Sequence, residues 1–151
     1  MYEVRKLNVK NSGQGLELAI KAVHERGLNN IDFDKTDFSD KCKMLFVSPA
    51  VEKWGLFVQE EMVGFLIASL TIGIWTKNPF IEIMATHILP EHRDINTYQQ
   101  LMNHVYNFAK EKQVTDIKLR NDVFILQNNL TFLTQNGFAE TSQNWEKTID
   151  Y

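Results

Sequence analysis

The sequence contains few of the residues that mark disulfide-stabilised, fibrous or disordered proteins. Its 151 residues include one cysteine, three prolines and seven glycines. The single Cys42 excludes a disulfide within the chain, and such sparing use of cysteine is typical of the cytoplasm. With so little glycine and proline, and with 23% charged residues, a long disordered segment is not expected.

Long apolar runs and clusters of one charge are also missing. The longest apolar stretch, Met62–Trp75, is too short to cross a bilayer and is rich in residues that favour strands. No Lys/Arg run stands out and the net charge is −3, which argues against nucleic acid or an anionic membrane as the partner. The first residues lack the pattern of a signal peptide, so we expect a cytoplasmic protein.

Apolar residues make up 44% of the chain, enough for the full core of one domain covering residues 1–151. Periodicity and turn residues predict ten elements in the order β-α-α-β-β-β-α-β-α-β. The predicted strands are Tyr2–Leu7, Trp54–Gln59, Met62–Leu70, Phe80–Leu89, Thr115–Leu119 and Phe138–Ile149. The predicted helices are Ser12–Glu25, Phe38–Val47, Thr97–Lys112 and Leu126–Gln135.

Three local signals set the expected ends of these elements. Ser12 is the predicted N-cap of the first helix, and Gly27 is its predicted stop. The polar stretch Leu28–Asp40 is expected to be a loop. Glu60-Glu61 is the expected turn of a hairpin, although two glutamates are poor turn residues.

The stretch Phe80–Met102, FIEIMATHILPEHRDINTYQQLM, is the part around which the rest is organised. An apolar strand ends at PEHRDINT, which has the residues of a helix start, and an amphipathic helix follows. A strand that leads directly into a helix directs free backbone N–H groups and the positive end of the helix dipole at one point, which suits a phosphate. The helix residues expected on one buried face are Tyr98, Leu101, Val105 and Phe108.

This strand, its ending in hydrophobic-x-Pro-x-x-Arg and the helix after it resemble the pyrophosphate-binding motif of the GNAT superfamily of acyl-CoA N-acyltransferases. Asn136-Gly137-Phe138 resembles the Gly-Phe that follows the superfamily's last helix, and the match runs from about Val51 to the end of the chain. The resemblance implies an α/β fold, with a mixed twisted sheet that carries helices on both faces. It also implies acetyl-CoA as co-substrate and an amine as acceptor. Exposed edges of such sheets often pair, so a homodimer is a further expectation.

Glu82 is the candidate catalytic residue. A carboxylate within an apolar strand is costly to bury unless it is paired, hydrated or protonated. By alternation Glu82 shares a face with Met84, Thr86 and Ile88. His87 is then expected on the opposite face. The resemblance places Glu82 where histone-acetylating members carry the general base. The alternative is a structural glutamate paired with a Lys or Arg.

The resemblance also implies a donor site along this stretch. The backbone of Thr86, His87 and Ile88 would pair with the pantetheine arm, and Arg93 matches the Gln/Arg that opens the motif. No metal is expected, because His87 and His92 have no third ligand at suitable spacing. The backbone N–H groups expected to hold the pyrophosphate belong to Asp94, Ile95, Asn96, Thr97, Tyr98 and Gln99.

The sequence departs from the superfamily pattern at several positions. Asn96 and Tyr98 replace two small residues, and Tyr98 blocks the site unless its ring points into the core. Asp94 brings a negative charge to the expected diphosphate position. Leu133 stands where many members have a tyrosine that protonates the departing thiolate, and Leu126 stands where they have an asparagine.

Three functional hypotheses follow. The first is an N-acetyltransferase that moves an acetyl group from acetyl-CoA to a primary amine by direct transfer. The second is a catalytically inactive protein of the same fold, a binding or structural module in a viral or other assembly, because several departures fall at one site. The third is an acyltransferase that uses another donor, such as an acyl-carrier protein. The sequence does not identify the amine acceptor.

Overall fold

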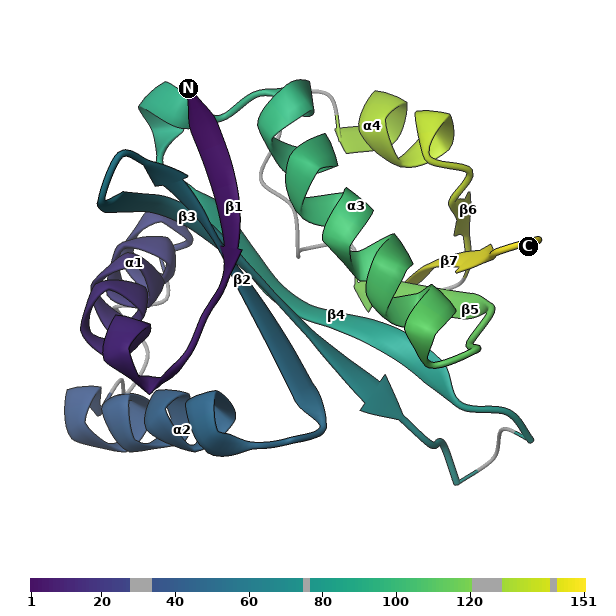
Figure 1. Cartoon of the computed structure of the whole chain (residues 1–151), viewed down its shortest axis with the longest axis horizontal. Helices are drawn as coiled ribbons and strands as arrows, with labels where there is room; N and C mark the ends of the chain where they lie inside the picture. Colours follow the sequence, from purple (N-terminus) through teal and green to yellow (C-terminus); the bar gives the residue numbers. More distant parts are fainter. Residues whose placement is uncertain (28–33, 75–76, 121–128, 142–143) are drawn as a thin grey trace.

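The computed structural model of residues 1–151 describes all of them except 28–33, 75–76, 121–128 and 142–143 (Figure 1). The strands are β1 (Tyr2–Lys6), β2 (Val51–Val58), β3 (Glu61–Thr71), β4 (Phe80–Ile88), β5 (Asp116–Arg120), β6 (Ala139–Glu140) and β7 (Asn144–Thr148). The helices are α1 (Ser12–Glu25), α2 (Lys35–Val47), α3 (Ile95–Glu111) and α4 (Asn129–Gln135). Two 3₁₀ turns, η1 (Val9–Asn11) and η3 (Pro90–His92), precede α1 and α3.

The described strands form one sheet in the order β1-β2-β3-β4-β5-β7-β6. Only β4 and β5 are parallel neighbours, and α3 connects them, as parallel strands require a crossover. The other neighbouring pairs are antiparallel. The prediction of a mixed sheet is therefore confirmed.

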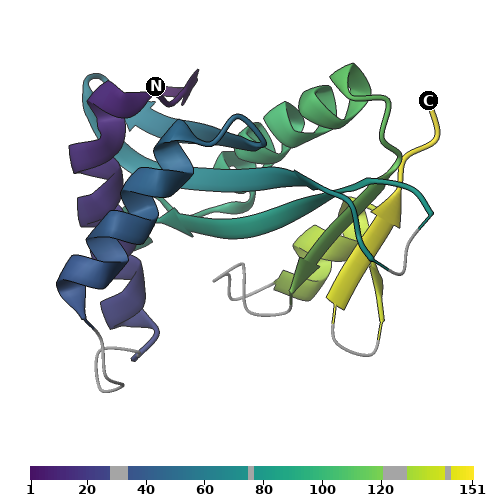
Figure 2. The ribbon, with the colours of Figure 1, turned by 90° about the horizontal axis from the view of Figure 1, so that it is seen from below.

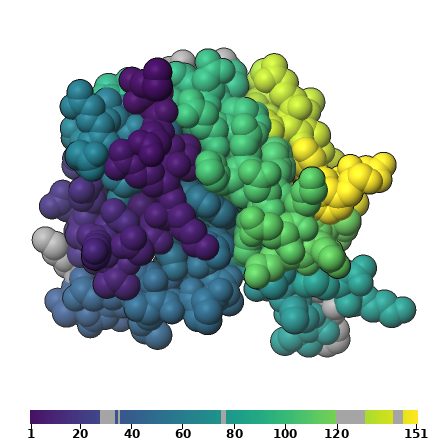
Figure 3. Space-filling view, in the orientation of Figure 1, coloured from purple at the N-terminus to yellow at the C-terminus, as the bar shows by residue number. Residues whose placement is uncertain are grey.

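The helices cover both faces of this sheet (Figures 1 and 2). Lys53 and Trp54 are adjacent in β2 and so point to opposite faces. Lys53 donates hydrogen bonds to the end of α2, whereas the ring of Trp54 lies 6.0 Å from that of Phe108 in α3. Helix α4 lies on the α3 side, with Phe132 against Tyr98. In the space-filling view α3 crosses the visible face between β1 and α4 (Figure 3).

The predicted apolar face of α3 is confirmed. Four residues at helical spacing are at most 5% exposed and pack against the apolar side of β2, β3 and β4. Burial of such a face is what stabilises a surface helix, because helix propensity alone is weak. These residues are Tyr98, Leu101, Val105 and Phe108.

Several predicted ends were wrong because side-chain caps decide where helices begin. Ser12 is the first residue of α1 rather than its cap, since Asn8 caps the preceding η1 turn. Asp34 accepts from two backbone N–H groups and starts α2 at Lys35, so the predicted loop was too long. Asp94 likewise starts α3 two residues earlier than predicted.

Turns account for the remaining differences. The β2–β3 turn is Gln59-Glu60, one residue earlier than predicted, and Gln59 takes a φ of 58°. The predicted strand Phe138–Ile149 is two paired strands, β6 and β7. Gly27, with a φ of 69°, ends α1 as predicted, because such backbone angles favour glycine. The predicted start of α4 at Leu126 lies outside the described residues.

A β-bulge interrupts β4 at Met84. Ala85 pairs with Ile67 of β3, but the next pair along β3 joins Ala68 to Ile83, so Met84 is an extra residue. An extra residue shifts the alternation of side chains by one position. The residues after the bulge therefore face the opposite way from the simple prediction.

Candidate functional site

The strands β4 and β5 pair over only three residues each, Ile81–Ile83 with Ile117–Leu119. The bulge follows directly after this short ladder, and the described part of β5 ends at Arg120, one residue beyond its last pair. Within the described residues, the β5-facing edge of β4 from Met84 to Ile88 has no strand partner. An unpaired strand edge offers backbone N–H and C=O groups to an extended ligand.

The bulge corrects the predicted faces of β4. Glu82 pairs with Ser69 and His87 pairs with Phe65, and these two β3 residues are four positions apart on one face. Glu82 and His87 therefore lie on the same face, contrary to the prediction. Two residues that were predicted to share a face with Glu82 instead face α3. They are Thr86 and Ile88.

Glu82 belongs to a polar row that crosses the open face of the sheet. Register places Lys118 beside Glu82, and Glu146 beside Lys118. The Lys118 ammonium lies 3.6 Å from the Glu146 carboxylate and 4.5 Å from the centre of the Phe80 ring. Half-buried Glu82 has no hydrogen bond or ion pair with the described residues, so its carboxylate is available to a ligand.

The start of α3 is held by a capping box. The Asp94 carboxylate accepts from the Thr97 backbone N–H at 2.8 Å, and the Thr97 hydroxyl accepts from the Asp94 N–H at 3.1 Å. The Tyr98 N–H bonds to the Asp94 carbonyl. Ile95 and Asn96 are left as the first-turn residues whose N–H groups have no partner in the described chain. Two of the six predicted N–H donors are thus free for an anion.

Tyr98 does not block this helix end. Its side chain is fully buried, and its ring centre lies 6.0 Å from that of Phe132 in α4. The neighbouring Gln99 also points toward α4, where its amide oxygen accepts from Asn136 at 2.9 Å. Both side chains therefore join α3 to α4. The Gln99 N–H lies within the helical ladder and is not free for a ligand.

Arg93 is engaged within the protein. Its guanidinium forms two hydrogen bonds with the Glu25 carboxylate, at 2.7 and 2.8 Å, and two with the Ile88 carbonyl, at 3.1 and 2.8 Å. The hydrogen bonds from Arg93 lower the pKa of the Glu25 carboxyl. No sequence pattern indicates Glu25, which lies 68 positions before Arg93.

His87 lies beside this ion pair. It is 1% exposed, and its Nδ1 is 3.7 Å from the Glu25 carboxylate without a hydrogen bond. Burial lowers the pKa of His87, and the Glu25 charge only partly opposes this. His92 instead meets Tyr2, whose hydroxyl lies 3.1 Å from Nδ1. The described residues include no group of three or more His, Cys, Asp and Glu side chains that could hold a metal ion.

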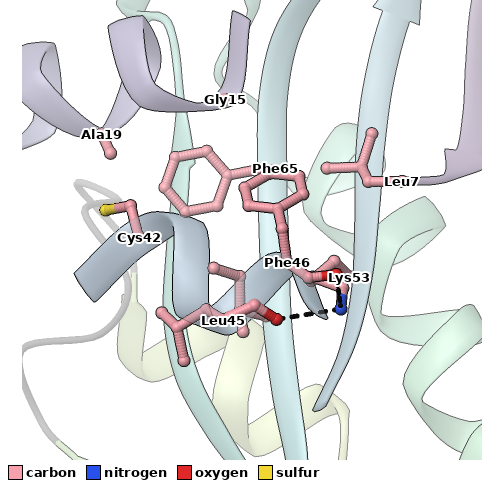
Figure 4. Close-up of a pocket in the computed structure, with 9 residues that line it drawn as sticks. Leu7, Gly15, Ala19, Cys42, Leu45, Phe46, Lys53 and Phe65 are labelled. Atoms are coloured by element: carbon pink, nitrogen blue, oxygen red, sulfur yellow. Dashed lines mark hydrogen bonds between the residues drawn. The ribbon is translucent and has the colours of Figure 1, made fainter. Parts of the chain in front are cut away.

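A second buried cation, Lys53, was also missed by the sequence analysis. Its ammonium donates to the Leu45 and Phe46 carbonyls at the end of α2, at 3.0 and 3.1 Å (Figure 4). Positive charge at a helix C-terminus is favourable, which offsets the cost of burial. The adjoining cavity of about 20 Å³ is apolar and too small for a substrate. Cys42 lines it, and burial raises the pKa of this thiol.

The position expected to carry an acid is apolar. Leu133 is 3% exposed, so it supplies no proton donor. Leu126, the other position that departs from the pattern, lies outside the described residues. The Tyr106 hydroxyl donates to Asn136 at 2.6 Å, and burial raises its pKa to about 12. Tyr106 is therefore a structural hydrogen-bond donor between α3 and α4.

No described helix combines the length and apolar character needed to cross a membrane.

No protein-family model matches the sequence, and a search of curated proteins found no match.

Solved structures, by contrast, share the fold over the whole chain. A GNAT-family acetyltransferase from Staphylococcus aureus is 16% identical, with a TM-score of 0.76 and coverage of 99% of this chain and 100% of that one. A predicted acetyltransferase from Clostridium acetobutylicum, in a structure with acetyl-CoA, is 14% identical, with a TM-score of 0.78 and coverage of 94% and 92%. PaiA N-acetyltransferase from Thermoplasma acidophilum, in complex with coenzyme A, is 16% identical, with a TM-score of 0.71 and coverage of 99% of both chains. The chain has the GNAT fold, as the resemblance implied.

The environment of His87 predicts a loss of stability in mild acid. Folding lowers its pKa from the ordinary 6.5, so below about pH 6.5 the unfolded chain binds more protons than the folded chain. The free energy of unfolding should therefore fall as the pH drops from about 7.5 to about 5.5. His104, whose pKa burial also lowers, should contribute to this fall.

Thermal unfolding at the two pH values tests this. His87→Gln should reduce the difference in Tm between them, while His24→Gln, which alters an exposed histidine of α1, should leave it unchanged. An equal fall in Tm for His87→Gln and the unaltered protein would show that His87 does not titrate as described.

Proposed function

We propose that residues 1–151 form a single N-acetyltransferase domain that moves an acetyl group from acetyl-CoA to a primary amine. The observation that carries the proposal is the unpaired edge of β4 after the Met84 bulge, which leads to the free N–H groups at the start of α3. An extended thioester arm that ends in a diphosphate matches this sequence of donors and acceptors. The similar folds solved with acetyl-CoA or coenzyme A support the same donor.

The donor would be bound mainly by backbone groups. The pantetheine arm would pair with the β4 edge along Thr86–Ile88, as a strand added to the sheet. The diphosphate would accept from the N–H groups of Ile95 and Asn96, where the dipole of α3 also favours negative charge. Arg93 would support this turn from inside the protein, since its donors are already used.

Glu82 would act as the general base. The amine nitrogen attacks the thioester carbonyl carbon, and Glu82 takes the proton that the nitrogen loses, directly or through water. A backbone N–H stabilises the negative charge on the carbonyl oxygen. The carbon–sulfur bond then breaks and the electron pair leaves on sulfur. With Leu133 buried and apolar, the thiolate would take its proton from water.

One second function has specific support. Asp94 already places a carboxylate at the start of α3, and Leu133 offers no acid. Both features suit a catalytically inactive protein that keeps the fold and binds another partner. This alternative differs from the enzyme in one measurable property, the affinity for acetyl-CoA.

Titration of acetyl-CoA into the purified protein tests the donor. We expect a micromolar Kd by calorimetry and a Tm that rises with ligand concentration, because acetyl-CoA binds the folded chain only. Acetyl-pantetheine, which lacks the diphosphate, should bind much more weakly. Absence of binding at millimolar acetyl-CoA would exclude the proposed donor and favour the inactive module.

The Asp94 carboxylate predicts a variant that binds the donor more tightly. Asparagine caps helices as well as aspartate does, so Asp94→Asn should keep the cap and remove the charge that repels the diphosphate. We expect the Kd for acetyl-CoA to fall about two- to fivefold, with the gain shrinking at high salt. Glu111→Gln, at the opposite end of α3, is the matched control. A weaker or unchanged affinity for Asp94→Asn would place the diphosphate elsewhere.

The base role of Glu82 predicts a loss of turnover without a loss of donor binding. Glu82→Gln should lower kcat for an accepted amine about 100-fold or more, while the Kd for acetyl-CoA stays within about twofold. Glu146→Gln removes a carboxylate from the same face and should change kcat little. Unchanged turnover in Glu82→Gln would mean that another group takes the proton.

A further inference from the structure

The contact between Glu25 and Arg93 joins three elements at the donor end of the site. Glu25 is the last residue of α1, Arg93 lies between η3 and α3, and Ile88 is the last residue of β4. The Arg93 guanidinium binds both carboxylate oxygens of Glu25 and the Ile88 carbonyl at once. One planar group therefore fixes where β4 ends and where α3 begins relative to α1.

This arrangement leaves Arg93 unable to reach a phosphate without giving up these bonds. Its side chain is 13% exposed, and its Nε and both terminal nitrogens already donate within the protein. Paired charge-assisted hydrogen bonds are among the strongest polar contacts in proteins and set geometry as well as energy. Arg93 thus binds groups of the protein itself and is not placed to bind the phosphates of a ligand.

Glu25 is the partner that joins Arg93 to α1, whereas the other contacts of Arg93, with the Ile88 carbonyl and the buried Tyr98 side chain, lie within the β4–α3 segment itself. His87 lies 3.7 Å from the same carboxylate, but its Nδ1 forms no hydrogen bond with it. Without Glu25, the Arg93 guanidinium would lose both of its bonds to α1 and keep only contacts within its own β4–α3 segment. The N–H groups of Ile95 and Asn96 lie within three residues of Arg93, so their direction depends on this anchor.

We propose that Glu25 is a positioning residue for the donor site: through Arg93 it holds the turn before α3 so that the free N–H groups of Ile95 and Asn96 meet the diphosphate. The inference rests on the proposed function, because it requires acetyl-CoA as ligand. It adds a residue of α1, outside the strand-turn-helix motif, to the determinants of donor affinity. The contribution of Glu25 is specific to the diphosphate, since the pantetheine arm binds along β4.

The test compares two donors in the full-length chain. Glu25→Gln keeps the shape of the side chain and removes its charge. We expect the Kd for acetyl-CoA, measured by calorimetry, to rise about tenfold. The Kd for acetyl-pantetheine, measured by NMR chemical-shift titration, should stay within about twofold. Glu17→Gln, an exposed position of the same helix, is the matched control and should change neither Kd.

A second variant guards against misfolding of the first. Arg93→Lys keeps the charge but loses the planar fork, so it should weaken acetyl-CoA more than acetyl-pantetheine, as Glu25→Gln does. Equal losses for both donors would show a general structural role and overturn the proposal, and so would an unchanged Kd for acetyl-CoA in both variants. If the unaltered protein does not bind acetyl-CoA, the proposed function fails first, and the two failures are thereby distinguished.

Discussion

The bulge at Met84 is the constraint on which the site depends. The extra residue in β4 follows directly after Ile83, the last residue of β4 that pairs with the described part of β5, and a bulge strengthens the local twist. The same residue reverses the alternation, which leaves Glu82 and His87 on one face. A regular β4 would turn His87 toward α3 instead. The bulge thus lies where the paired part of β4 gives way to the edge that the donor is proposed to use.

Charged groups of the protein itself already occupy part of the potential anion site at the start of α3. Asp94 caps the helix with its carboxylate, and Glu25 neutralises Arg93. Both contacts stabilise the free protein, and both reduce what remains to attract a diphosphate. What remains to attract an anion is the backbone N–H groups of Ile95 and Asn96, together with the dipole of α3. In the proposed enzyme, affinity for the donor would therefore depend on how accurately these two N–H groups are placed, and the Glu25–Arg93 pair would act at this point.

The sequence predicted the helices and strands well, but it did not predict which face of β4 each side chain lies on. Helical periodicity predicted the buried face of α3, including Tyr98, because that signal repeats over about three turns. The bulge left no such signal, since a continuous apolar run such as FIEIMATHIL hides which residue is extra. Glu25 could not be found either, because it lies 68 positions before Arg93 in the sequence and meets it only in the folded chain. The roles of Glu82 and of the residues of the α3 turn stay predictions.

The departures from the superfamily pattern do not all bear on the same step. Tyr98 replaces a small residue, but its Cβ points into the core and its ring packs on Phe132, so its bulk is absorbed by the α3–α4 contact and not by the ligand site. Leu133 removes an acid, which affects only the departure of the thiolate. A thiol is acidic enough to leave without a dedicated donor, at some cost in rate. Binding of the proposed donor is therefore compatible with both substitutions, whereas the speed of the proposed turnover would depend on how readily water reaches the sulfur.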